Sequence, residues 1–307
     1  MEFPLVVKAM TSEHGFMYCA TDWEGFASGD LPTVAQALAD MDRFPAVIDH
    51  TLQGELNFLY LARLMIHPQG FSANPAFQVT KGGVTSSFID TTRAYYDGNS
   101  QGGIYGGTVM AVAPDMDRGV LGVPGINYST LLRRSTDFAT YAVPLYTAYP
   151  SEYERPLLLS VIQILWDRAD PNGYQNTLAP GRQLPNTPPH VIMYQAGFGD
   201  HQVANVTADT AARSIGAAVD PTPFEDPDRS PDVQDVWGVP RIPSYPYQGS
   251  AIVYFDIGPF NYQPGKGTPP APTENVAQHE GEDPHEAPRN TPCGRVMKSN
   301  FLRPDGV

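Results

Sequence analysis

The stretch that most constrains the fold is residues 95–103, with the sequence YYDGNSQGG. Before it, residues 88–96 are rich in β-branched and aromatic side chains, which favours a buried strand. After it, residues 103–113 alternate small and apolar side chains, which is typical of a helix packed closely on a sheet. Residues 98–102 between them therefore fit the pattern G-x-S-x-G in the strand–turn–helix context that this pattern requires.

This pattern predicts that Ser100 is a nucleophile. A serine on so sharp a turn takes a strained backbone conformation, so the residues two places either side must lack bulk. The helix that follows points its first N–H groups at any negative charge that forms there, and the N–H of Gln101 would be one oxyanion-hole donor. The alternative is a glycine-rich turn that carries an ordinary serine.

A carboxylate stands where a catalytic acid is expected. Residues 190–196 predict a buried strand, residues 197–203 its exit loop, and residues 207–218 the next helix. Because side chains at the carboxyl ends of parallel strands point into the ligand crevice, Asp200 is the predicted acid. The alternative is that Asp200 only caps the helix. We assign Asn99 and His201 to substrate binding, since the neighbour of Asp200 diverges from it on leaving the strand.

The segment DGNSQGG at 97–103, followed by VLGVPG at 120–125, resembles the nucleophile region of bacterial α/β-hydrolases of the esterase/lipase type. The likeness extends to ATDWEG at 20–25, GDH at 199–201 and the tail at 283–301, in the right order. It implies an α/β-hydrolase fold, a mostly parallel sheet flanked by helices with a cap-like insertion. It also implies the chain order Ser, acid, His, a small-molecule or lipid-like ester substrate, and no cofactor.

The base is expected in the tail that follows the last predicted strand, residues 250–256. DPHEAPR at 283–289 resembles the region that bears the catalytic histidine in these esterases, which implies His285 as the base, with His279 as the alternative. Nearby carboxylates would raise the pKa of the histidine if they stay close: Glu280, Glu282, Asp283 and Glu286. A metal site built from these residues is a weaker interpretation, because their spacing matches no standard ligand pattern.

The chain divides into a first core part at 1–124, an insertion or cap at 125–189 and a second core part at 190–307, all in one domain. The insertion contains a predicted helix at 155–166. Its aromatic residues would either shape a pocket for apolar esters or pack the insertion on the body: Tyr141, Tyr146, Tyr149, Trp166 and Tyr174.

The beginning of the chain is short for this fold. Residues 15–21 predict a buried strand, and residues 2–13 leave no room for the three strands that should precede it. We expect that these N-terminal strands are missing or supplied by another chain, or that the oxyanion hole is rebuilt from the backbone of Trp23 or Glu24. The sheet edge left exposed would favour a homo-oligomer.

Two segments with apolar residues at helical spacing follow, at 33–41 and 51–66, and the second predicts the core residues Leu52, Leu56, Leu59, Leu61 and Leu64.

Composition excludes several partner classes. The net charge of −14 with only 19 basic residues argues against nucleic-acid binding, and it disfavours anionic membrane surfaces. No apolar run reaches transmembrane length and no signal peptide opens the chain, so location stays undecided, although proteins of this kind are often exported. Cys19 and Cys293 are predicted to be free thiols.

Together these features predict a serine carboxylesterase or lipase-like hydrolase that works through an acyl-enzyme, with Ser100, Asp200 and His285 as its triad. Two alternatives remain open. One is a serine hydrolase of amide or lactone bonds, and the other is a catalytically impaired homologue that serves as a binding protein.

Overall fold

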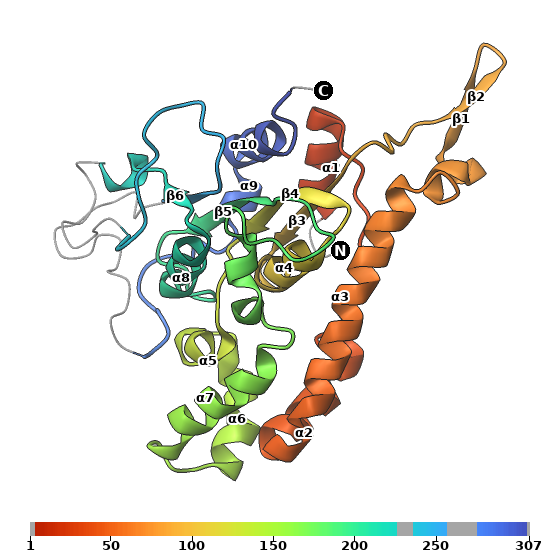
Figure 1. Ribbon diagram of the computed structural model, residues 1–307. Helices are drawn as coiled ribbons and strands as arrows, with labels where there is room; N and C mark the ends of the chain where they lie inside the picture. Colours follow the sequence, from red (N-terminus) through yellow and green to blue (C-terminus); the bar gives the residue numbers. More distant parts are fainter. Residues whose placement is uncertain (1–3, 226–235, 257–274, 306–307) are drawn as a thin grey trace.

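A five-stranded, all-parallel sheet forms the centre of the computed structural model, which describes residues 4–225, 236–256 and 275–305 (Figure 1). Its spatial order is β3-β4-β5-β7-β6. The strands are β3 (Ala94–Asn99), β4 (Met116–Gly122), β5 (Val191–Gly197), β7 (Ala251–Phe255) and β6 (Ala218–Val219). A separate antiparallel hairpin, β1 (Gln78–Lys81) with β2 (Val84–Ser87), stands away from the body beyond the end of α3.

Helices cover both faces of this sheet. They are α1 (Pro4–His14), α2 (Leu31–Ala39), α3 (Phe44–Ile66), α4 (Gln101–Val112), α5 (Tyr128–Leu131), α6 (Phe138–Ala148), α7 (Glu154–Trp166), α8 (Asn205–Ile215), α9 (Ala287–Asn290) and α10 (Pro292–Leu302). An α/β class with a mostly parallel sheet, as predicted, is therefore what the chain forms. Among the described residues, no helix combines the length and the apolar character needed to cross a bilayer.

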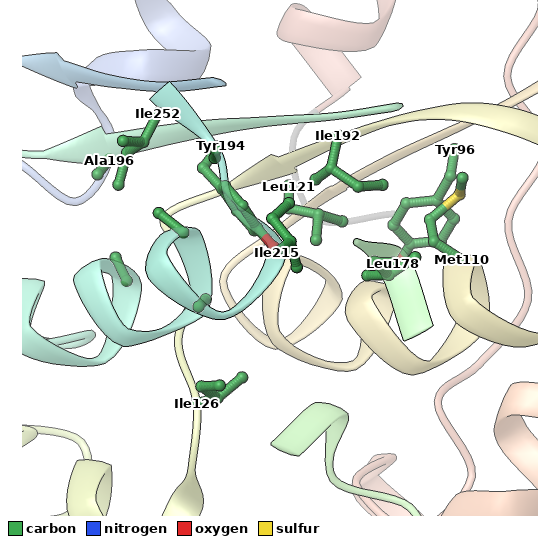
Figure 2. Packing of buried hydrophobic residues seen from close by; sticks show 14 of the residues in the cluster. Tyr96, Met110, Leu121, Ile126, Leu178, Ile192, Tyr194, Ala196, Ile215 and Ile252 are labelled. Carbon is green, nitrogen blue, oxygen red and sulfur yellow. The ribbon is translucent and has the colours of Figure 1, made fainter. Parts of the chain in front are cut away.

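The sheet buries alternate residues on opposite faces because successive side chains of a strand point in opposite directions. Leu121 and Tyr194 join the main core with Ile215 of α8, and Figure 2 shows these side chains meeting between sheet and helices. Val120 and Met193, one position earlier in β4 and β5, pack instead with α10 on the other face. Near-continuous apolar strands are typical of a parallel sheet covered on both sides.

The insertion packs on α2 and α3 as a second apolar cluster. Trp166 of α7 contacts Phe44 at 4.8 Å between ring centroids, and its indole N–H donates to the Tyr105 hydroxyl at 3.0 Å. The backbone N–H of Met41 donates to the hydroxyl of Tyr149. These contacts show that Trp166 and Tyr149 hold the insertion to the body, which is one of the two roles predicted for its aromatic residues.

Two predicted strands are wrong in whole or in part. Residues 15–21 form no strand, because their backbone makes no hydrogen bond with β3 among the described residues. The strand predicted at 88–96 begins only at Ala94, and Phe88 is 58% exposed. Apolar residues before Ala94 instead support the hairpin stem, where the rings of Phe77 and Phe88 lie 6.0 Å apart.

The prediction of the α3 core is also partly wrong. Leu56 and Leu64 are exposed, and in the second half of α3 the buried positions are Glu55, Ala62 and Gly54, the last of which packs against the backbone of Glu24. The strands predicted at 190–196 and 250–256 and the helix predicted at 207–218 are confirmed within one to three residues as β5, β7 and α8. Both cysteines are free, as expected.

Candidate active site

The turn between β3 and α4 carries Ser100 in the conformation that its sequence predicts. Ser100 has φ of 57° and ψ of −123°, a region that side-chain-bearing residues rarely adopt. Its backbone N–H donates to the carbonyl of Gly122 at 3.0 Å, which ties the turn to β4. A strained serine that precedes a helix is typical of a residue held in place for function.

Small residues make this turn sterically feasible, although not all at the predicted positions. A Cβ at Gly98 would overlap the carbonyl oxygen of Gly102, so glycine is required there. A Cβ at Gly102 would meet the Tyr96 hydroxyl at 3.6 Å, an ordinary contact. The second required glycine is instead Gly103, whose Cβ would overlap the carbonyl of Gly122 and force α4 away from β4.

Asp200 and His285 form a buried pair at the carboxyl end of the sheet. The Nδ1 of His285 lies 2.9 and 3.0 Å from the two carboxylate oxygens of Asp200, and the two side chains are only 2% and 1% exposed. The Asp200 Oδ1 also accepts from the backbone N–H groups of Gln202 and Val203, both at 2.8 Å. The carboxylate is thereby fixed so that His285 carries its hydrogen on Nδ1 and presents Nε2 as the basic nitrogen.

Hydrogen bonds between the loop of Asp200 and the loop of His285 hold this pair together. The Asp283 Oδ1 accepts from the backbone N–H of both His201, at 3.2 Å, and His285, at 3.1 Å. Its Oδ2 accepts from the side-chain amide of Gln202 at 2.8 Å. The ring of His201, only 9% exposed, lies 3.0 Å from the carbonyl of Glu280. Asp283 and His201 thus position the loop that carries His285.

The pKa of His285 is raised above its ordinary value of 6.5. Burial and the positive charge of Arg289 lower it, but the hydrogen bond that His285 donates to Asp200 and the charge of that carboxylate more than reverse them. The Nε2 of His285 is buried and has no hydrogen-bond partner, so it makes no hydrogen bond with the Ser100 hydroxyl in this structure. A buried, unpartnered nitrogen on a raised-pKa histidine is a candidate proton acceptor.

A cavity of about 570 Å³ lies beside Ser100. Asn99, Gln101 and Trp23 line it with the serine, and Val6 and Met10 of α1 form part of its wall. The structure therefore brings Asn99 and Trp23 to the cavity, as predicted, whereas His201 does not line it. The backbone N–H of Glu24 donates to the carbonyl of Asp22 at 3.1 Å, whereas among the described residues the N–H of Trp23 makes no backbone hydrogen bond.

Two cations also line this cavity, and both are already paired. The Lys298 Nζ lies 2.7 and 2.9 Å from the carboxylate oxygens of Asp97, which accepts a further hydrogen bond from the hydroxyl of Tyr18. Arg289 forms a two-point ion pair with Glu286. Since each positive charge has a carboxylate beside it, the cavity wall does not demand an anionic ligand.

Gln101 has a fixed side chain as well as a favourable backbone position. As the first residue of α4, its N–H has no acceptor within the helix. Its Oε1 accepts from the Tyr128 hydroxyl at 2.9 Å, and its Nε2 is buried without a partner. Tyr128 is held by stacking on Trp166, with centroids 4.5 Å apart, and by its backbone N–H, which donates to Asp170.

The alternative base and the alternative metal site gain no structural support. His279 is exposed, and its backbone N–H donates to the side chain of Gln278 at 2.9 Å. In the part of the chain that the structure describes, no group of three or more His, Cys, Asp or Glu side chains is arranged to hold a metal ion.

Comparisons with protein-family models, with curated proteins and with solved structures gave no match to this chain.

Several residues of this site were not predicted from the sequence. Arg289 lies in the same DPHEAPR segment as His285, so a signal for it was present. Lys298 and Tyr128 had none, because an ordinary helix lysine and an insertion tyrosine reach the site only through long-range packing.

Proposed function

We propose that this chain is a serine hydrolase of carboxylic esters with an α/β-hydrolase fold. The observation that carries the proposal is the buried Asp200–His285 pair, whose free Nε2 lies at the same edge of the sheet as the strained Ser100. Ser100 directly follows β3, Asp200 lies in the loop after β5 and His285 bonds to Asp200, which supports a triad at the carboxyl edge of one parallel sheet.

The reaction would proceed in two halves. The Ser100 Oγ attacks the ester carbonyl as the Nε2 of His285 takes its proton, and the N–H of Gln101 donates to the oxyanion. The tetrahedral intermediate expels the alcohol, which takes the proton from His285, and leaves an acyl-enzyme. Water then attacks the acyl carbon with His285 as base, releasing the carboxylic acid and restoring the serine. Attack requires the Ser100 side chain to turn toward Nε2, as catalytic contacts often tighten only when substrate binds.

The test is the variant Ser100→Ala with Ser160→Ala as its matched control, since Ser160 is exposed on α7 and donates only to its own helix. Turnover of a p-nitrophenyl ester should fall about 10⁶-fold in Ser100→Ala, as in other triads. Ser160→Ala should keep parental activity, and both should melt near the parental temperature. Near-parental turnover by folded Ser100→Ala would end the proposal.

A fluorophosphonate probe separates this proposal from a binding role. An adduct on Ser100 in the parental chain, absent from Ser100→Ala, supports a reactive serine. Folded protein without an adduct would favour the catalytically impaired homologue. A panel of matched esters, amides and lactones then identifies the bond that is cleaved.

A further inference from the structure

We propose that a slot along the outer edge of β3 binds an extended, uncharged, apolar peptide segment of another polypeptide, which adds a strand to the sheet. This slot, of about 250 Å³, has residues Ala94–Asp97 of β3 along one side and residues 15–19 along the other. It lies at the opposite edge of β3 from β4, because β3 is the first strand in the sheet order.

The edge of β3 that faces this slot offers unused hydrogen-bonding groups. In a parallel pair, alternate residues of a strand bond to each neighbour, so pairing with β4 uses only half of the β3 backbone groups. Among the described residues, no backbone–backbone hydrogen bond joins residues 15–22 to β3. The Tyr18 hydroxyl, which donates to Asp97 at 2.8 Å, is a side-chain contact and leaves the backbone edge open.

The opposite edge of the same sheet is closed by the chain itself. Val219 of β6 donates to the carbonyl of Pro240 at 2.8 Å, and Ile242 donates back to the carbonyl of Val219 at 2.9 Å. An open edge is a template for a further strand, and proteins usually pair or cover it. The slot is therefore a site for strand addition, where main-chain groups supply affinity and side-chain pockets supply specificity.

The walls of the slot define the chemistry of its occupant. Apolar residues of α3 line it: Phe58, Leu61, Ala62 and Met65. Phe16 packs edge-on to Tyr95 on the opposite wall, with ring centroids 6.3 Å apart. Alternate side chains of an added strand that point into the slot must therefore be apolar.

The charged side chains at the slot each have at least one partner, which favours an uncharged occupant. Among the described residues that line the slot, only the Nε of Arg303 is left as a buried donor without a partner. Arg93 pairs with Asp305 at 2.7 Å, and Asp97 pairs with Lys298 at 2.7 Å. Arg303 donates to the carbonyl of His14. The exposed strands β1 and β2 of this chain, with the sequences QVTK and VTSS, contain one valine each, so neither strand presents a row of alternate apolar side chains to these walls. A different polypeptide is thus a better occupant than a second copy.

The first measurement is residue-resolved amide hydrogen exchange on the whole chain. Alternate amides within Ala94–Asp97 should exchange at least about 100-fold faster than those bonded to β4. Adding an end-capped heptapeptide of alternating valine and threonine should slow the fast set. The same peptide with proline in place of threonine should have no effect, because proline has no N–H to donate.

A matched pair of variants tests the location. Leu61→Trp should fill the slot and weaken binding of the valine–threonine peptide at least about tenfold, whereas Leu64→Trp, exposed on the same helix, should not. Uniformly slow exchange across β3 in the monomeric protein, or no peptide binding by the parental chain, would overturn the proposal. So would a dimer in size-exclusion chromatography that Leu61→Trp dissociates, since a second copy would then fill the slot.

Discussion

The two sides of the candidate active site are built differently. On the acid–base side, Asp200 and His285 are buried and their loops are cross-linked through Asp283. On the oxyanion side, the N–H of Gln101 begins a helix and the Gln101 side chain has one hydrogen bond within the described residues, from the Tyr128 hydroxyl. The first side is fixed by several charge-assisted bonds, and the second by one neutral bond and the helix itself.

This difference predicts which side of the site contributes more to ester hydrolysis. If the proposed mechanism holds, removing a group from the acid–base side takes away the proton acceptor or its orientation. Removing a side chain from the oxyanion side leaves the backbone N–H of Gln101 in place, so the loss should be partial. The expected sizes of the effects below follow this order.

The largest effect is expected for His285→Ala. Without the imidazole the Ser100 hydroxyl has no base, so kcat should fall about 10⁶-fold, as when a triad histidine is removed elsewhere. Steady-state kinetics with a p-nitrophenyl ester would measure it. The matched control His279→Ala, in the same tail but exposed, should leave kcat unchanged. If His279→Ala loses the activity and His285→Ala keeps it, the acid–base side has been assigned to the wrong histidine.

Asp200→Asn should have the next largest effect, a loss of about 10⁴-fold in kcat with little change in KM. The amide can donate to His285 Nδ1, which favours the tautomer with its hydrogen on Nε2 and so removes the proton acceptor. Asp209→Asn is the control, since that half-buried carboxylate on α8 accepts from the hydroxyl of Tyr254 and not from His285. Equal losses in both variants would indicate general destabilisation rather than a catalytic acid.

The parts of this site that the sequence predicted are local. The turn at Ser100 depends on the small size of a few adjacent residues, its flanking glycines. Asp200 follows a strand that is recognisable from its continuous run of apolar residues. The prediction of His285 as the base depends on a resemblance to esterases, because the local sequence does not distinguish it from His279. Burial against Asp200 separates the two in the structure.

What the sequence missed depends on packing between distant segments. The apolar residues at 15–19 suit a strand and a slot wall equally well, and only the missing backbone bonds distinguish them. Leu56 and Leu64 match helical spacing, yet α3 buries a different face, on which Gly54 packs against the backbone of Glu24 and Ala62 joins the main core. The Tyr128–Gln101 contact joins residues 27 positions apart and has no local signature.

An effect of intermediate size is expected for the pH dependence of kcat/KM, which should report on the acid–base side and not on the oxyanion side. His285 acts as base only when neutral, and its pKa is raised, so kcat/KM should fall about tenfold per pH unit below an inflection above pH 6.5. In Asp200→Asn the inflection should move to lower pH, because the lowering of the His285 pKa by burial and Arg289 is then opposed only by the charge of Asp283.

Stability should respond in the opposite direction. A pKa raised by folding means that protonated His285 stabilises the native state, fully so below the unfolded pKa of about 6.5. That stabilisation is lost as pH rises through the folded pKa of His285. Between the unfolded and the folded pKa, the contribution of His285 to stability should therefore fall while the ester activity rises. Denaturant unfolding of the parental chain and Asp200→Asn at several pH values checks this. A parental activity profile that is flat from pH 5 to 8 would rule out His285 as the titrating base.

The smallest effect is expected on the oxyanion side, for Tyr128→Phe. The variant keeps the ring stacked on Trp166 but removes the donor to Gln101 Oε1, a bond worth about 0.5–1.5 kcal/mol. At about 1.36 kcal/mol per factor of ten, kcat should fall about two- to tenfold. KM should change little, because Gln101 is expected to act on the charge that develops in the transition state. Tyr141→Phe, outside the cavity, is the control. An unchanged kcat in Tyr128→Phe would mean that α4 alone fixes the oxyanion donor, and the contrast between the two sides would then lie in the backbone.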